Sequence, residues 1–280
     1  MSIELPEARI LAGQMEKELL GKRIVSYELA DYERLQKIGM LNKDERSFNR
    51  LVDREIKSIV SRGNSILVKF DSAMNLLISP EYGGKIFFHA SEKAVSGKFH
   101  LKLVFGDGTV LTTRLTSMGV IFAVNDEELK RSYTYMRDFN PQVNSPLDEG
   151  FTFDRFSGLL SENNRMLKAV LVGKDAVLVG LSNSAFQDVI YRARLHPKRK
   201  AGELREDEQQ ALYDAIKTVV EERFRLGGKD EFYDLYGKQG SYTPAMGPRM
   251  RDHSCPLCGT SIEKLSLGGG RVYICPECQV

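Results

Sequence analysis

Every cysteine of this 280-residue chain lies near its C-terminal end, in the pairs Cys255–Cys258 and Cys275–Cys278. Four thiolates in two Cys-x-x-Cys pairs can close a tetrahedron around one Zn²⁺, which is the usual geometry of a structural zinc site. Two disulfides are the alternative, but a Cys-x-x-Cys disulfide closes a very small ring, and nothing else in the sequence indicates an oxidising compartment. The pattern predicts one structural zinc ion in a small C-terminal unit, of a kind that often contacts nucleic acid.

The composition is that of an ordinary globular protein, with 42% hydrophobic residues, 28% charged residues and a net charge of +2. No apolar run approaches the length of about 18 residues that a membrane-spanning helix needs. The segment Met1–Glu7 has no hydrophobic stretch of the kind found in a secretory signal peptide. We therefore expect a cytoplasmic protein of the bacterial-type cytosol, long enough for two or three domains.

Positive charge is concentrated in two segments of this otherwise balanced chain. Residues 192–200 read Arg-Ala-Arg-Leu-His-Pro-Lys-Arg-Lys, and Arg249 and Arg251 come shortly before the first cysteine pair. One such run alone is typical of a solvated surface. Two of them beside a zinc ribbon favour contacts with phosphates, and therefore a nucleic-acid partner.

The spacing of apolar residues changes along the chain from helical to β and back to helical. A helix is predicted from Leu5 to Leu20, where Gly21 ends it. Short β runs separated by turn signals follow, and their regular spacing favours a β-sandwich or flattened barrel with one helix packed on it. We predict strands at residues 56–60, 65–70, 75–79, 85–89, 100–105 and 109–113, and helices at 153–161, 166–172, 184–192 and 207–224, the last with Asp207 as its N-cap.

Several short motifs occur along the chain in a fixed order. They are Glu4-Leu-Pro-Glu7, Phe139-Asn-Pro141 with Pro146-Leu147 and Phe151, Leu167–Leu171, Val179–Asn183, Leu195-His196-Pro197, Tyr236–Gly240, Cys258–Ile262, Gly270-Arg271, Tyr273 and Cys278-Gln279. In this order they resemble the formamidopyrimidine-DNA glycosylase/endonuclease VIII family of base-excision repair enzymes. Each motif alone is weak to moderate, but together they span essentially the whole chain.

The resemblance implies an α+β fold in three parts. These are an N-terminal β-sandwich domain with a long first helix over residues 1–140, a helix-two-turn-helix DNA-binding domain over 141–240, and a zinc-finger β-hairpin over 241–280. The implied partner is double-stranded DNA with a damaged base or an abasic site, lying between the first two domains with the target nucleotide flipped out. One molecule suffices for one lesion, so we expect a monomer that is associated with the nucleoid when bound.

The resemblance also implies a set of DNA-binding residues. Lys168 and Asn183 match positions that hold phosphates beside the lesion, and Arg271 would reach the same phosphates from the zinc-held hairpin. Tyr82 stands at the position of the family's methionine wedge, and Met118 lies in the second loop that enters the duplex. An aromatic or apolar side chain at either place can fill a vacated base stack.

The N-terminal end departs from the family pattern. Active members use an N-terminal proline as the nucleophile, and here Ile3 stands at the matching position, after Met1 and Ser2. Removal of Met1 would leave the primary amine of Ser2 one residue beyond the expected place, a large displacement for catalytic alignment. The strand-turn motif that supplies a catalytic lysine has Asn64 instead.

The acidic residues of the motif are retained. Glu4 matches the family's catalytic carboxylate, and Glu7 matches its second acid. The alternative interpretation is that both serve only as acids in the first turn of the helix, where the dipole favours negative charge.

Three functions stay open. The first is a DNA glycosylase of altered specificity, in which the Ser2 amine or a water activated by Glu4 attacks the sugar, with or without strand cleavage by lyase chemistry. The second is a damaged-DNA-binding protein on the same scaffold that has lost its chemistry. The third is a zinc-ribbon protein that contacts RNA or a protein partner. The retained context of Glu4 favours the first.

Overall fold

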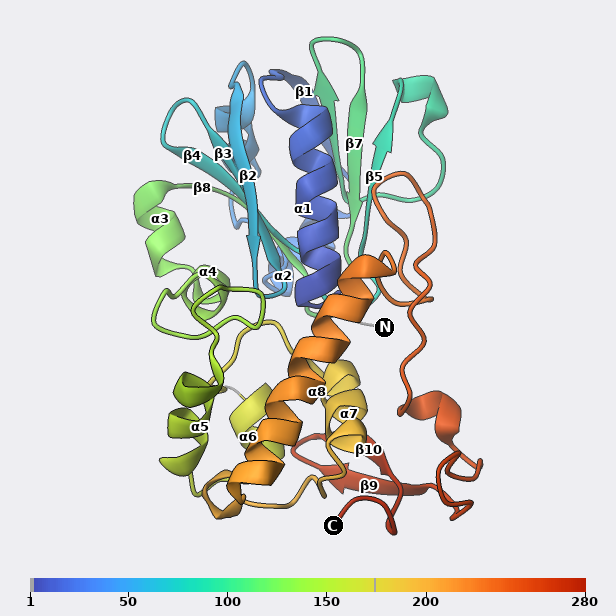
Figure 1. Ribbon diagram of the computed structural model, residues 1–280. Helices are drawn as coiled ribbons and strands as arrows, with labels where there is room; N and C mark the ends of the chain where they lie inside the picture. Colours follow the sequence, from blue (N-terminus) through green and yellow to red (C-terminus); the bar gives the residue numbers. More distant parts are fainter. Residues whose placement is uncertain (1–2, 174) are drawn as a thin grey trace. The chain divides into compact units, whose positions relative to one another are not determined.

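The computed structural model describes residues 3–173 and 175–280, and it divides into two compact units (Figure 1). The first unit contains the described residues up to Asn140 together with Leu226–Ser241, and the second contains Pro141–Arg225 and Tyr242–Val280. Each unit is thus built from two separate stretches of chain. Residues 226–241 belong with the first unit by compactness, while the three expected domain boundaries stay a prediction.

The first unit begins with helix α1 (Leu5–Leu19), whose N-terminus is closed by a reciprocal pair of hydrogen bonds. Glu4 is the N-cap, and its side chain accepts a hydrogen bond from the backbone N–H of Glu7. The Glu7 side chain in turn accepts one from the backbone N–H of Glu4, at 3.1 Å. This capping box satisfies two donors that the start of a helix leaves unpaired. The apolar face of the helix is buried through Ala8, Leu11, Ala12, Met15 and Leu19.

Two four-stranded antiparallel sheets enclose the core of this unit, in the strand orders β1-β6-β7-β5 and β2-β3-β4-β8. The strands are β1 (Ile24–Leu29), β2 (Ile56–Arg62), β3 (Ser65–Phe70), β4 (Met74–Ser79), β5 (Lys85–His89), β6 (Leu101–Phe105), β7 (Val110–Arg114) and β8 (Val120–Asn125). Buried residues of α1 and of both sheets form one hydrophobic core. The predicted β-sandwich with a packed helix is therefore confirmed.

Strand β4 is buried along its whole length because both faces of its sheet are covered. On the outer face, Leu67 and Leu77 form a smaller cluster with Leu129 of helix α3 (Asp126–Arg131) and with Tyr135 of helix α4 (Tyr133–Asp138). Like α2 (Tyr32–Lys37), these helices have six residues and bury at most two of them, so no apolar period marks them in the sequence.

The second unit contains the four helices predicted for this part of the chain. They are α5 (Phe153–Ser161), α6 (Leu167–Val172), α7 (Asn183–Arg192) and α8 (Glu206–Arg225). The prediction of Asp207 as an N-cap is wrong, because α8 begins one residue earlier and the Asp207 carboxylate instead pairs with Arg205 at 3.1 Å. Helix α7 is capped by Ser182, so that Asn183 is its first residue.

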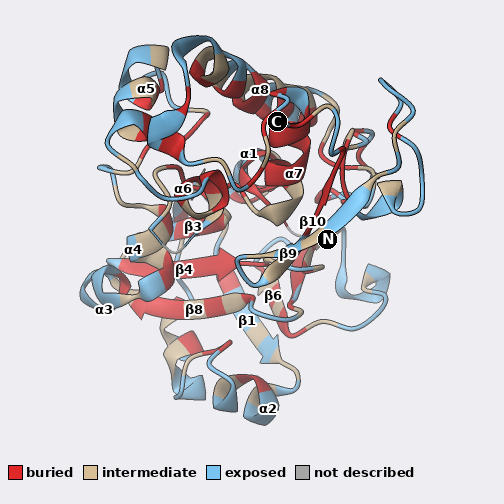
Figure 2. Ribbon diagram, turned by 90° about the horizontal axis from the view of Figure 1, so that it is seen from below, coloured by how far each residue is buried: buried red, intermediate tan, exposed pale blue. Residues whose placement is uncertain are grey.

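A two-stranded antiparallel hairpin completes the second unit. Its strands are β9 (Glu263–Leu267) and β10 (Gly270–Ile274), joined by Gly268 and Gly269, whose positive φ angles of 52° and 74° allow the tight turn. Strand β10 is mostly buried, whereas β9 is mostly exposed (Figure 2). Among the helices described, none is long and apolar enough to cross a membrane.

Gly240 provides a test of how tightly residues 226–241 fold back on themselves. A Cβ at this position would lie 2.4 Å from the carbonyl oxygens of both Gly228 and Lys229. We expect Gly240→Ala to lower the free energy of unfolding by about 1–3 kcal/mol, because backbone atoms would have to shift. Gly13→Ala is the control: a Cβ there meets nothing within 4 Å in the exposed middle of α1, and stability should rise by about 0.5–1 kcal/mol. Urea denaturation measures the free energy of unfolding of both variants. An unchanged free energy of unfolding for Gly240→Ala would contradict this packing.

Candidate functional site

The two acidic residues of the N-terminal motif lie in a buried polar cluster with Lys229. The Nζ atom of Lys229 lies 3.4 Å from Oε2 of Glu4, and the backbone N–H of Lys229 donates to Oε1 of Glu7 at 3.1 Å. The Lys229 side chain is 3% exposed and that of Glu4 is 0% exposed. An ion pair this deeply buried needs good geometry and further hydrogen bonds to offset the loss of hydration. The fold thus holds an ammonium group against the predicted catalytic carboxylate.

Lys229 reaches this place through the segment 226–241, which is fastened along α1. Gln14 accepts a hydrogen bond from the backbone N–H of Leu235 at 3.0 Å and donates to the Asp234 carboxylate at 2.8 Å. The Tyr236 hydroxyl donates to the Glu18 carboxylate at 2.7 Å. These contacts fix the path of the segment along the helix.

Sequence reasoning missed Lys229 as a functional residue. The glycine pair before it, Gly227 and Gly228, indicates in sequence only the end of a helix. Both glycines have positive φ angles, 72° and 91°, and they turn the chain after α8. The partners Glu4 and Lys229 are 225 positions apart in sequence, so no local motif could indicate their pairing.

Ile3 does not offer a free amine at the position where the resembled family has its proline. Its side chain is buried, at 2% exposure, and its backbone N–H donates to the carbonyl of Glu81 at 3.1 Å. The other predicted amine, that of Ser2, lies outside the described residues, as does Met1. Of the N-terminal candidates, the structure therefore describes the two carboxylates but not the amine.

The two predicted wedge residues are exposed on neighbouring loops. Tyr82, 43% exposed, lies in the β4–β5 loop, and Met118, 69% exposed, lies in the β7–β8 loop. The loops are close together, since a Cβ on Gly83 would lie 3.3 Å from Oγ1 of Thr116. Partial burial, and then the negative charges of Glu4 and Glu81, raise the pKa of the Tyr82 phenol above its usual value. Tyr82 therefore stands near the buried acidic cluster as well as near solvent.

Asn64, at the place of the expected lysine, has no charged group to contribute. Its Oδ1 atom is buried and has no hydrogen-bond partner among the residues that the structure describes. Nearby, the Gly63 Cα closely approaches Asp138, because a Cβ there would lie 2.8 Å from the Asp138 Cγ. Asp138 accepts hydrogen bonds from Ser65 at 2.5 Å and from Arg137 at 2.6 and 2.8 Å. The turn is thus held by a carboxylate and an arginine that sequence reasoning did not single out.

Arg137 links this turn to the loop that carries Tyr82. Besides Asp138, it donates to the Glu81 carboxylate at 2.9 Å. Burial disfavours its charge, but the two carboxylates outweigh burial and raise the pKa of Arg137 further. Together with the hydrogen bond from the backbone N–H of Ile3 to the Glu81 carbonyl, this ion pair holds the residue before Tyr82 in place.

In the second unit, the predicted phosphate-binding residues come together at the hairpin. The Nζ atom of Lys168 donates to the carbonyl of Leu267 at 2.7 Å, and Nδ2 of Asn183 donates to the carbonyl of Arg271 at 2.8 Å. Burial lowers the pKa of the Lys168 ammonium, while the Arg271 side chain is exposed. Side chains of helices α6 and α7 thus donate hydrogen bonds to both strands of the hairpin beside its turn. Lys168, Asn183 and Arg271 lie close together there.

Two glutamines that sequence reasoning did not single out as site residues fix the hairpin on the helices. Gln187 accepts a hydrogen bond from the backbone N–H of Tyr273 at 2.8 Å and donates to the carbonyl of Asn183 at 2.9 Å. Gln279 accepts one from the backbone N–H of Cys275 at 2.9 Å and donates to Leu195 at 3.0 Å. Both glutamines are buried, so these bonds set the orientation of the hairpin within the unit.

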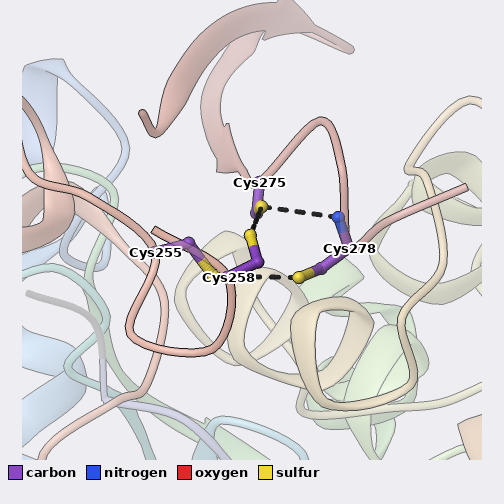
Figure 3. Close-up of side chains that lie close together, drawn as sticks. All are labelled: Cys255, Cys258, Cys275 and Cys278. Atoms are coloured by element: carbon purple, nitrogen blue, oxygen red, sulfur yellow. Dashed lines mark hydrogen bonds between the residues drawn. The ribbon is translucent and has the colours of Figure 1, made fainter. Parts of the chain in front are cut away.

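The four cysteines converge on one point, as predicted (Figure 3). All four Sγ atoms lie within 4.8 Å of one another, and Cys258 and Cys275 are 3.4 Å apart while Cys255 and Cys278 are 3.9 Å apart. Four sulfurs at about 2.3 Å from one Zn²⁺ in a tetrahedron would be about 3.8 Å apart. The spacing and chemistry of this set therefore fit one zinc ion.

Hydrogen bonds also prepare Cys255 to act as a ligand. Burial opposes its ionisation, but the hydroxyl of Tyr191, at 3.3 Å, and the backbone amides of Leu257 and Cys258 lower its pKa to about 6. A thiol with this pKa is mostly thiolate at neutral pH, and the thiolate is the form that binds metal.

Three basic side chains of the segment 192–200 form ion pairs within the protein. Arg192 pairs with Asp188 at 3.1 Å, Arg199 pairs with Glu208 at 3.0 Å, and Lys200 pairs with Glu203 at 3.2 Å. Arg192 also pairs with Glu222 of α8 at 3.5 Å, and Arg199 joins the chain before α8 to that helix. The phosphate contacts predicted from the two basic segments stay a prediction.

Comparison with known proteins gives matches along nearly the whole chain. The model of the formamidopyrimidine-DNA glycosylase N-terminal domain matches residues 3–115, and that of the formamidopyrimidine-DNA glycosylase H2TH domain matches residues 143–231. Between them they cover most of the chain. The chain is 26% identical to the formamidopyrimidine-DNA glycosylase of Roseiflexus sp. and 27% identical to that of Protochlamydia amoebophila, over 99% of each chain.

Solved structures show the same fold. A complex between Lactococcus lactis Fpg and DNA containing an abasic site has a TM-score of 0.83 at 23% identity, over 99% of both chains. The MutM (Fpg) protein of Thermus thermophilus has a TM-score of 0.80 at 26% identity, over 99% of this chain and 98% of that one.

Proposed function

Since the chain belongs to the formamidopyrimidine-DNA glycosylase/endonuclease VIII family, we propose that it binds duplex DNA containing a damaged base or an abasic site and acts as a DNA glycosylase in base-excision repair. The observation that carries the proposal is the Glu4 carboxylate, which is buried at the capped end of α1 while Lys229 is held against it. A DNA substrate supports a cytoplasmic location, and one lesion needs only one molecule.

Grip on the DNA backbone is assigned to Lys168, Asn183 and Arg271. Arg271 is exposed and can bind a phosphate through its fork of N–H donors. The Lys168 ammonium has three donors and gives one to Leu267, so it can serve a phosphate while still holding the hairpin. The position of Tyr82 and Met118 on exposed neighbouring loops supports their role as the side chains that fill the gap left by a flipped nucleotide.

Chemistry is assigned to Glu4. In the simplest route the carboxylate accepts a proton from a water molecule whose oxygen attacks C1′ of the flipped nucleotide, and the glycosidic bond breaks with its electron pair leaving on the base. In the second route the Ser2 amine, freed by removal of Met1, attacks C1′ instead, the base leaves with the electron pair of the glycosidic bond, and Glu4 accepts a proton from the amine nitrogen. The C1′–O4′ bond then breaks as the C=N bond of the imine forms, O4′ takes that proton, and strand cleavage can follow. Glu7 holds the backbone of Glu4 and of Lys229 in both routes.

A damaged-DNA-binding protein without chemistry is the alternative. It is favoured by two observations: Ile3 is buried with its backbone N–H bonded to Glu81, and Asn64 replaces a lysine with an amide. Both proposals share the same grip on DNA, and they differ only in whether Glu4 takes part in a reaction.

One structural zinc ion is proposed for the four cysteines, because their sulfurs have the spacing and chemistry of a Cys₄ site. When bound, the ion ties the loop before β9 to the end of β10 and so fixes the hairpin that carries Arg271.

For the metal, we predict one equivalent of zinc per chain by elemental analysis. Cys275→Ser should lower the zinc content and weaken binding to a duplex with an abasic-site analogue by about 10-fold or more, because the hairpin loses its anchor. Ser261→Ala, an exposed position beside the site but outside the cysteine set, should bind zinc and DNA normally. DNA binding by Cys275→Ser equal to the wild type would contradict a role of the zinc site in DNA binding.

For the phosphate grip, Lys168→Met should weaken binding to all duplexes by about 10-fold and should reduce the slope of log K against log salt by about 1. Lys217→Met is the control, since this lysine is on α8 and pairs with Glu221 at 3.0 Å. Fluorescence anisotropy at several salt concentrations measures both slopes. An unchanged slope for Lys168→Met would remove Lys168 from the phosphate contacts.

For the chemistry, Glu4→Gln should reduce base release by at least about 100-fold while DNA binding stays within about threefold, because the amide keeps the shape of the side chain but cannot accept a proton. The variant also leaves Lys229 without its carboxylate partner, so its thermal unfolding is measured alongside. Borohydride trapping on abasic-site duplexes separates the two routes: an adduct at Ser2 supports the amine route, and base release without an adduct supports the water route. Tight binding with neither base release nor an adduct would reject the glycosylase proposal in favour of the inactive DNA-binding protein.

A further inference from the structure

We propose that Lys229 is a positioning residue for Glu4, the cation that keeps this carboxylate ionised and aimed during the reaction. The inference deepens the proposed function and rests on it. It assigns a chemical task to a lysine that no motif of the sequence indicates.

The first observation is the geometry of the contact. The Nζ atom of Lys229 lies 3.4 Å from Oε2 of Glu4, with the two side chains 3% and 0% exposed. At that depth water screens little of the attraction between opposite charges. The state of Glu4 therefore depends strongly on whether the ammonium is present.

The second observation is the charge of the surroundings. Glu7 and the Tyr82 phenol also face Glu4, and both are acidic groups that add no positive charge. A buried carboxylate without a nearby cation takes up a proton, and a protonated carboxyl cannot accept the proton of an attacking water or amine. Lys229 counters this tendency because its ammonium lies against the Glu4 carboxylate.

The third observation is that Lys229 is held at both of its ends. Its backbone N–H is fixed by Glu7, and the segment that follows is fixed by Gln14 through Asp234 and Leu235. Gly240 packs against the carbonyl of Lys229 so closely that no side chain fits there. A lysine normally has many rotamers, but burial of this side chain to 3% exposure on a fixed backbone restricts them before DNA arrives, which is the purpose of preorganisation.

The same contacts also brace residues 226–241 on α1, so the test must separate an electrostatic role from a purely structural one. We would compare Lys229→Met, which keeps the length of the side chain without its charge, with Lys229→Arg, which keeps the charge. Gln14→Leu is the matched control, because it removes two hydrogen bonds between α1 and the same segment without touching the charge on Glu4. Glu4→Gln and the Glu4→Gln/Lys229→Met double variant complete the set.

Each variant is first checked for cooperative thermal unfolding and for binding to a duplex with an abasic-site analogue. Single-turnover base release is then measured on the oxidised-base duplex that the wild-type protein processes fastest. We expect Lys229→Met to slow base release by about 100-fold with binding changed by no more than about threefold, while Lys229→Arg stays within about tenfold of the wild type. The double variant should be no slower than Glu4→Gln, because Lys229 acts through Glu4.

Three outcomes would overturn the inference. One is base release by Lys229→Met that equals that of Gln14→Leu, which would leave only the bracing role. Another is a double variant much slower than Glu4→Gln, which would mean that Lys229 acts independently of Glu4. The third is a wild-type protein that binds the duplex but releases no base, which overturns the glycosylase proposal itself. This outcome is distinguishable from the first two, because both of those require a wild-type protein that releases the base.

Discussion

The buried contact between Glu4 and Lys229 joins the beginning of the first unit to the stretch of chain that returns to it after the whole helical region. Glu4 caps α1, and α1 contributes its apolar face to the core that both sheets share. Lys229 lies in the segment 226–241, which runs along the same helix. Removing one partner of such a buried pair typically costs about 3–5 kcal/mol, because it leaves an uncompensated charge. The capped helix end, the returning segment and the candidate catalytic carboxylate therefore depend on one another.

In the second unit, the surrounding residues support the short hairpin that carries the exposed cation Arg271. A two-stranded hairpin alone is only marginally stable in water. Here the cysteine cluster closes one end of it, Gln187 and Gln279 fix its backbone, and Lys168 and Asn183 bond to carbonyls beside its turn. Arg271 is left exposed on a supported backbone. The residues proposed to hold phosphates thus also hold the element that carries their arginine partner.

Local patterns predicted much of this structure, and the reason is physical. The strands at 65–70 and 85–89 and the helix at 153–161 were predicted at their observed bounds, because apolar periodicity and turn residues are properties of neighbouring residues. The cysteine cluster was predictable because the spacing of the ligands is itself the constraint. The short helices α2, α3 and α4 were not predicted, because each buries at most two of its residues and so shows no apolar period. The prediction of Asp207 as a cap was wrong because a favourable residue type does not fix the residue at which a helix begins.

What could not be predicted are contacts between residues far apart in the chain. The pairing of Lys229 with Glu4, the link from Arg137 to Glu81, and the burial of the Asn64 Oδ1 atom all arise only when the chain is folded. The sequence indicated that the N-terminal proline and the turn lysine were replaced. It did not indicate that another lysine is placed against the retained carboxylate.

The most direct test of the account is detection of the free damaged base after the wild-type protein and Glu4→Gln are incubated with a panel of oxidised-base duplexes. Mass spectrometry of the small-molecule fraction identifies the base regardless of whether the strand is cut. We predict release of at least one damaged base by the wild-type protein and a loss of at least about 100-fold in Glu4→Gln, with DNA binding retained in both. Equal release by the two proteins, or binding without release by either, would contradict the account.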